Sequence, residues 1–143
     1  MDERIEKNQK GLTLVELLAV VVILAIVAAI AFVLIGNVIE NSKKDAHVAN
    51  AQQVISAVKL AEASGDIEWK ENKADVTNLE TIGSLVDPWD KKKYTTAEVT
   101  KDEEIYKVTL RNATADAKCE ISETPEEELQ QGRKEVCDQS SGS

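Results

Sequence analysis

The feature that most constrains this chain is a run of 23 residues, 17–39, without a single ionisable side chain. Nearly all of these residues are Leu, Val, Ile or Ala. As a helix the run would rise about 35 Å, which is enough to cross a bilayer core of about 30 Å. The run is too long for the apolar core of a cleaved secretory signal peptide. The sequence therefore predicts a helix that spans a membrane.

One acidic residue, Glu16, stands directly before this apolar run. An ionisable group at the edge of a membrane is costly to place there, so it is by default a candidate for a function. The alternative is an incidental acid at the membrane surface, and the residue type alone leaves both interpretations open.

The residues before the run add a second signal. Gly11, followed by Leu-Thr-Leu-Val-Glu and some twenty apolar residues, resembles the class III signal of type IV prepilins and pseudopilins. In that family a membrane peptidase cuts after the glycine and methylates the new amino terminus. The resemblance implies cleavage between Gly11 and Leu12, N-methylation of Leu12, and a role in subunit assembly for Glu16. The chain departs from the family at Leu12, where phenylalanine is usual, and at Val33, where many members have proline.

The resemblance and the apolar periodicity together predict four segments. Residues 1–11 would be a cleaved leader, 12–36 a transmembrane or filament-core helix, 37–63 an amphipathic continuation of that helix, and 64–143 a small globular head. In the third segment, apolar residues recur with helical spacing at Val48, Ala51, Val54, Ile55, Val58 and Ala61. The predicted fold class is α+β: a long amino-terminal helix packed on a small antiparallel sheet, as in pilins.

The first part of the head carries mixed signals. Apolar spacing allows one short helix over 76–86, and the proline in Asp87-Pro88-Trp89-Asp90 predicts a turn after it. We expect Trp89 to cover the core. The Asp-Pro-Trp triplet followed by Tyr94 is similar to a segment of major pseudopilins, although Asp90 replaces a glycine of that segment. A glycine-rich calcium loop, common in major pseudopilins, is not seen, which favours a pilus subunit.

The second part of the head is rich in β-forming residues. Strands are predicted at 94–99 and 105–111 with a turn at 100–103 between them, and a turn at 112–116 leads to a third strand at 117–121. In the second strand one face is apolar, and it carries Tyr106, Val108 and Leu110.

The last part of the chain predicts a short helix and a cross-link. Thr124 and Pro125 are expected to cap and begin a helix that Gly132 ends. That helix would return Cys137 to the strand that carries Cys119. If the head lies outside the membrane, a disulfide between them is permitted and would contribute about 3 kcal/mol in the chain-entropy model. Two unpaired thiols are the alternative.

Charge and motifs limit the chemistry of the head. The net charge of −9 disfavours direct binding to nucleic acid. We find no nucleophile motif and no phosphate-binding glycine loop, and two Cys with one His do not make a zinc site. We therefore expect no enzyme activity, cofactor or metal.

The sequence thus favours a structural subunit of a type IV pilus or related filament. The resemblance implies a homo-oligomeric helical filament, with a prepilin peptidase, an assembly ATPase and a platform membrane protein as partners. The precursor would lie in the cytoplasmic membrane and the filament at the cell surface. The alternatives are a pseudopilin of a type II secretion system, a subunit of a competence (DNA-uptake) pilus and, from another class, a single-pass anchored enzyme or binding domain.

Overall fold

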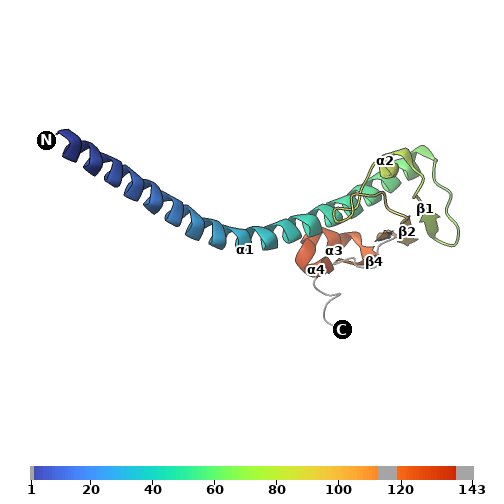
Figure 1. The fold of residues 1–143 in the computed structure, drawn as a ribbon. Coiled ribbons are helices and arrows are strands. Elements are labelled where there is room, and N and C mark those ends of the chain that lie inside the picture. Colours follow the sequence, from blue (N-terminus) through green and yellow to red (C-terminus); the bar gives the residue numbers. More distant parts are fainter. Residues whose placement is uncertain (1, 113–118, 138–143) are drawn as a thin grey trace. The chain divides into compact units, whose positions relative to one another are not determined.

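The computed structural model describes residues 2–112 and 119–137. The chain forms two compact units, Met1–Ile39 and Glu40–Ser143, and we call the second unit the head. The elements, most of which are labelled in Figure 1, are α1 Asp2–Ser64, β1 Lys73–Asp75, α2 Glu80–Gly83, β2 Thr96–Asp102, β3 Ile105–Arg111, β4 Ile121–Pro125, α3 Glu126–Gln131 and α4 Arg133–Cys137. The predicted α+β class, a long helix with an antiparallel sheet, is confirmed.

Helix α1 is continuous through the leader, the apolar run and the amphipathic stretch. The leader is helical from Asp2, although its apolar residues show no period. Its acids precede lysines by four residues, at Glu3 and Lys7 and again at Glu6 and Lys10, and this spacing favours a helix.

The helix ends where the sequence predicts its stop. Gly65 has a φ of 81°, and its N–H donates to the Glu62 carbonyl at 3.1 Å. The Asp66 N–H donates to the Ala61 carbonyl at 2.9 Å. This pair of hydrogen bonds is a Schellman ending, which favours glycine because it needs a left-handed backbone.

The head contains one antiparallel sheet with the strand order β1-β2-β3-β4. Strands β2 and β3 form a hairpin that is longer than predicted, since Lys101 pairs with Tyr106 and Asp102 with Ile105. The predicted turn at 100–103 is therefore wrong, and the reversal is confined to Glu103 and Glu104. With Thr100 and Lys107, three added pairs extend the ladder where the sequence, with four polar residues in a row, indicated a loop.

The core lies between the sheet and the amphipathic part of α1. The predicted stripe is confirmed except at its end, because Val48, Ala51, Val54, Ile55 and Val58 are all buried while Ala61 is half-buried. They join a single cluster with sheet residues and with residues of the carboxyl-terminal helices, which include Val99, Val108, Leu110, Ile121, Leu129 and Val136. The expectation that Trp89 covers the core is also confirmed, since it packs half-buried against the cluster.

Two predictions in the head are wrong in their boundaries, and one strand was missed. The helix expected over 76–86 is reduced to α2 because Val86 forms a β-bridge with Lys93, and β1 was not expected at all. The third strand, expected at 117–121, is β4 at Ile121–Pro125. Pairing with β3 starts at Ile121, opposite Leu110, and continues past a register shift to Pro125, so the ladder with β3, not local alternation, sets the strand.

The expected capping of the last helix is also wrong. Thr124 is buried within β4, and Pro125 is the N-cap of α3, with no side-chain hydrogen bond to the helix. Gly132 ends α3, as predicted, with a φ of 95°. A further helix, α4, follows and was not expected. The predicted turn at 112–116 lies outside the described residues except for Asn112, as do 117–118 of the predicted third strand.

Candidate functional site

The residues that the sequence selects for processing and assembly lie in the amino-terminal part of α1. Gly11, Leu12 and Glu16 are all helical and exposed. Leu12 and Glu16 are four residues apart, so they share one face of the helix with a rise of about 6 Å between them. Glu16 is the only ionisable residue between Gly11 and Ile39.

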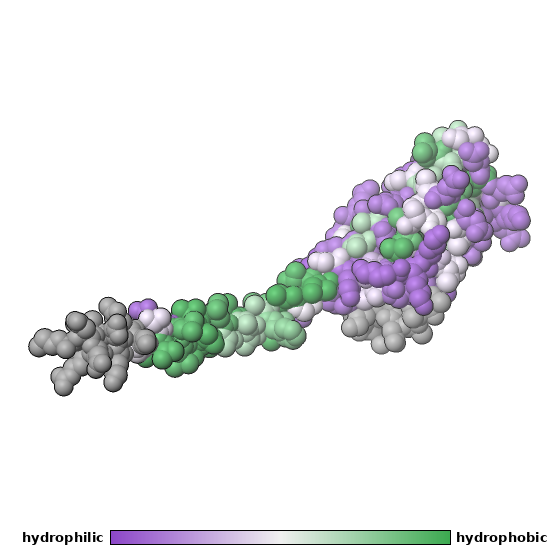
Figure 2. Space-filling view, turned by 45° about the horizontal axis from the view of Figure 1, so that its top comes forward, coloured by the Kyte–Doolittle hydropathy of each residue, from purple (hydrophilic) through white to green (hydrophobic). Residues whose placement is uncertain are grey.

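The apolar run around these residues is uncovered. The space-filling view in Figure 2 shows hydrophobic residues along the run and mainly hydrophilic ones over the head. Large side chains of the run are about half exposed or more, and Phe32 reaches 82%. By length and composition this helix could cross a membrane. An apolar surface of this extent needs lipid or protein to cover it, so the structure fits a membrane-anchored protein.

No neighbouring atom of the chain requires a glycine at position 11. A Cβ built at Gly11 would meet nothing within 4 Å, and the same holds at Gly36. Both glycines lie inside α1, where alanine would favour the helix by about 1 kcal/mol. A requirement for glycine at position 11 would therefore have to come from outside the chain.

A buried polar cluster joins the start of the head's helix to the segment before β2. His47 is buried, and its Nδ1 lies 2.8 Å from the Tyr94 hydroxyl. Asn50 Nδ2 donates to the same hydroxyl oxygen at 3.0 Å and to the Val86 carbonyl at 3.0 Å. Because Asn50 already donates to the oxygen, the hydroxyl proton is available to His47 Nδ1. This arrangement suits a neutral imidazole that carries its proton on Nε2.

Burial sets the protonation of this cluster. It lowers the pKa of His47, and the Asp87 carboxylate and a backbone hydrogen bond with Cys119 oppose that shift. Burial also raises the pKa of Tyr94, against the hydrogen bond from Asn50. Both side chains are therefore held in their neutral forms near pH 7.

The turn after α2 is fastened to the first residue of the head. Asp87 is buried, and its Oδ1 accepts the backbone N–H of Trp89 at 2.8 Å and of Asp90 at 3.3 Å. Trp89 Nε1 donates to Glu40 Oε1 at 3.0 Å, and its ring meets His47 edge-on with centroids 5.4 Å apart. Trp89 thus ties this turn to α1 one residue after the apolar run ends.

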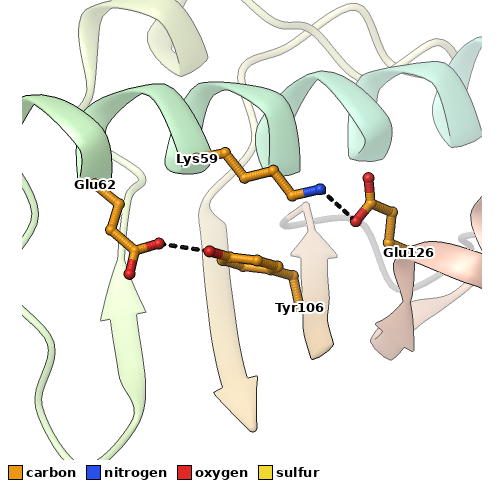
Figure 3. A network of polar contacts seen from close by, with 4 residues as sticks. All are labelled: Lys59, Glu62, Tyr106 and Glu126. Atoms are coloured by element: carbon orange, nitrogen blue, oxygen red, sulfur yellow. Dashed lines mark hydrogen bonds and ion pairs between the residues drawn. The ribbon is translucent and has the colours of Figure 1, made fainter. Parts of the chain in front are cut away.

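A second network fastens the other end of the head's helix to the sheet (Figure 3). The Tyr106 hydroxyl donates to Glu62 Oε2 at 2.6 Å, and Lys101 pairs with Glu62 Oε1. These contacts lower the pKa of Glu62, the hydrogen bond with Lys101 being the largest cause. Lys59 lies 5.2 Å from the Tyr106 ring centroid and pairs with Glu126 at 2.6 Å. The network holds the helix, β2, β3 and α3 in register.

The two cysteines are joined. Cys119 and Cys137 form a disulfide with a Cα–Cα distance of 4.5 Å, and both residues are buried. The bridge links the segment before β4 to the end of α4. It therefore closes the carboxyl-terminal helices onto the sheet.

Sequence reasoning missed most of the side chains that hold the head together. His47 and Tyr94 are 47 residues apart, and Glu62 and Tyr106 are 44 apart. No local pattern links such positions. A weak signal was present at His47, which lies next to Val48 at the edge of the apolar stripe. Within the described ranges, no group of three or more His, Cys, Asp or Glu residues is placed to hold a metal ion.

Comparison with known families matches one part of the chain. The prokaryotic N-terminal methylation motif matches residues 7–32, which contain Gly11, Leu12 and Glu16. No curated protein and no solved structure matches the chain. Proteins with this motif are structural rather than enzymatic. The motif implies processing by a prepilin peptidase and assembly into a filament.

The apolar helix and the motif define a membrane-anchored precursor with a class III signal. The motif and the α+β architecture support a type IV pilin-like or pseudopilin-like protein.

Proposed function

We propose that the chain is a structural subunit of a type IV pilus or type IV pilus-like filament, without catalytic activity of its own. The prepilin peptidase cuts it between Gly11 and Leu12 and methylates Leu12. Residues 12–36 then form the filament core, 37–63 continue that helix, and 64–143 form the head. The observation that supports this most is an uncovered apolar helix with one acid, joined to a head that has a separate core.

The proposed role of Glu16 follows from the energetics of a buried charge. A carboxylate among packed apolar helices has to be paired or neutralised. Cleavage creates an ammonium at Leu12, and the ammonium of a neighbouring subunit is the cation that the apolar segment can offer. Removing one partner of a buried ion pair costs about 3–5 kcal/mol. The pair would therefore set the axial register of subunits as well as stabilise their docking.

The proposed life cycle has two locations. The precursor is a single-pass protein of the cytoplasmic membrane, and the product is a helical homo-oligomer at the cell surface. An assembly ATPase and a platform membrane protein would drive the transfer. Direct binding to nucleic acid is not expected, because the chain carries a net charge of −9.

One observation supports a second candidate, a pseudopilin of a type II secretion system. The Asp87-Pro88-Trp89 turn and Tyr94, which are similar to a segment of major pseudopilins, pack together around His47. A subunit of a competence pilus has the same architecture. Imaging of expressing cells separates a pilus subunit from a secretion pseudopilin, because only the pilus subunit is expected to give surface filaments at native expression levels.

The central test is a series of substitutions at Glu16. Glu16→Ala should leave membrane insertion and cleavage largely intact while it sharply reduces the yield of filaments in sheared fractions. Glu16→Asp should restore part of the yield because the charge remains. Glu16→Gln should restore less because it cannot neutralise the ammonium. Glu104→Ala is the matched control, since Glu104 is an exposed acid in the hairpin turn. Equal filament yields from wild type and Glu16→Ala would refute the pairing.

A second test addresses processing. The chain offers equal room at Gly11 and Gly36, so Val at either position is tolerated alike by the precursor. Gly11→Val should block cleavage, whereas Gly36→Val should still give a mature chain that begins at Leu12. Mass spectrometry of the amino terminus measures both, together with the methyl group. Recovery of residues 1–10 in assembled filaments would contradict the proposal.

A further inference from the structure

Three consecutive lysines, Lys91, Lys92 and Lys93, form the strongest cationic feature on the surface of the head, and we call them the lysine turn. All three are exposed. No ion pair joins their ammonium groups to any residue in the described ranges. They stand out because the chain carries 26 acidic and 17 basic side chains.

The acids next to the lysine turn face the backbone. Asp87 Oδ1 accepts from the backbone of Trp89 and Asp90, as described above. Asp90 Oδ1 accepts the Lys92 N–H at 2.9 Å, and its Oδ2 accepts Asn112 Nδ2 at 2.7 Å. Both carboxylates thus accept hydrogen bonds from the turn or from Asn112, and all three lysine side chains are exposed.

The lysine turn lies at the end of the head where α1 leaves the apolar run. Trp89 is bonded to Glu40, the residue that follows Ile39. Tyr94 is bonded to His47, two turns further along the helix. In contrast, Lys101 meets Glu62, which is about 33 Å further along α1. A bilayer that holds the apolar run would have its surface near Glu40, the head residue to which Trp89 is bonded.

We propose that the lysine turn binds the anionic headgroups of the membrane that anchors the precursor. Trp89 is the aromatic residue at this level, and tryptophan favours the membrane–water interface. Lys43, one turn past the apolar run, adds a cation on the helix itself. This contact holds the lysine turn at the membrane surface before assembly. Assembly into a filament then breaks the contact.

The size of the effect follows from the number of lysines. Each lysine near an anionic surface contributes about a fivefold preference for the bound state. Three lysines together should shift the ratio of membrane-bound to lifted heads on the order of 100-fold. The preference should weaken with salt, because the Debye length falls from about 30 Å at 0.01 M to about 3 Å at 1 M.

The test uses the full chain, reconstituted without the peptidase or the assembly machinery. A Trp69→Phe background leaves Trp89 as the only tryptophan. Vesicles of phosphatidylcholine alone, or mixed with phosphatidylglycerol, carry brominated lipids that quench nearby tryptophan. We expect stronger quenching of Trp89 in the anionic vesicles, and loss of that excess in high salt.

Two triple variants of equal charge decide whether the lysine turn is responsible. Lys91→Gln/Lys92→Gln/Lys93→Gln should reduce quenching to the level in phosphatidylcholine. The matched control, Lys70→Gln/Lys73→Gln/Lys107→Gln, should leave quenching unchanged. Its β-strand positions are at the far end of the head, since Lys73 and Lys107 both pair with Thr100, next to Lys101.

Several results would overturn the inference. They are equal quenching in both kinds of vesicle, quenching that survives in the first triple variant, and quenching that follows the protein-to-lipid ratio rather than lipid charge. The last would indicate that the lysine turn meets a second copy of the chain. Amide hydrogen exchange over 86–93 in the unmodified chain provides a check independent of Trp69→Phe, with protection expected only in anionic vesicles. The inference rests on the membrane anchor and not on filament assembly, so its failure would leave the proposed function untouched.

Discussion

The disulfide offers a prediction whose magnitude can be worked out from the fold. The double substitution Cys119→Ala/Cys137→Ala removes a bridge with a sequence separation of 18. In the chain-entropy model, a closed loop of about 19 residues contributes about 3 kcal/mol to the free energy of unfolding at 25 °C. Both cysteines are buried, so the small voids left by alanine act in the same direction.

The measurement is thermal unfolding of the full chain in detergent micelles. Trp69 and Trp89 both pack against the core of the head, so their fluorescence reports on that unit. A loss of about 3 kcal/mol from a unit of this size should lower Tm by about 10–25 °C. Gln130→Ala is the control, since Gln130 is exposed within the same loop. A fall in Tm of less than about 4 °C would refute the reasoning that the bridge restrains the unfolded head.

Two further predictions concern pH and packing. Burial lowers the pKa of His47, so the unfolded chain binds the proton more tightly than the folded head does. The contribution of neutral His47 to the free energy of unfolding should be complete above about pH 6.5. It should decrease as the pH falls toward the lowered pKa. Urea titrations of wild type and His47→Gln at pH 7.5 and 5.5 test this. An equal loss of stability in both proteins would show that His47 is not the group responsible. Ile55 is 1% exposed and Leu60 69%, so Ile55→Ala should cost about 2–5 kcal/mol and Leu60→Ala less than about 0.5 kcal/mol, which the same titrations measure.

If His47 titrates as predicted, acid should first loosen the end of the head that carries Glu40 and Trp89. His47 lies between Trp89 and Tyr94, and these residues border the lysine turn. The Glu62 network holds the opposite end. Its carboxylate pKa is lowered below the ordinary value of 4.5, so its contribution is present above that pH and declines only in stronger acid. The two ends of the head should therefore respond to acid at different pH values.

The sequence alone determined the features that depend on local order along the chain. The apolar run, the position of Glu16 relative to Gly11, and the stripe from Val48 to Val58 are all patterns of neighbouring residues. A helix converts such spacing directly into a face or a span, so no tertiary contact is needed to read it. The same holds for the end of α1 at Gly65, which depends on one backbone conformation.

Tertiary structure alone decided how the head is held on its helix. The contacts of His47 with Tyr94 and of Glu62 with Lys101 and Tyr106 join residues about 40 or more positions apart. The short strand β1 forms because β2 offers it an edge, and pairing with β3 placed β4 at Ile121–Pro125, later than local alternation predicted. The stability of such elements comes from partners distant in sequence. Local propensity therefore indicated loops at some positions that form strands in the folded chain, because they pair with strands distant in sequence.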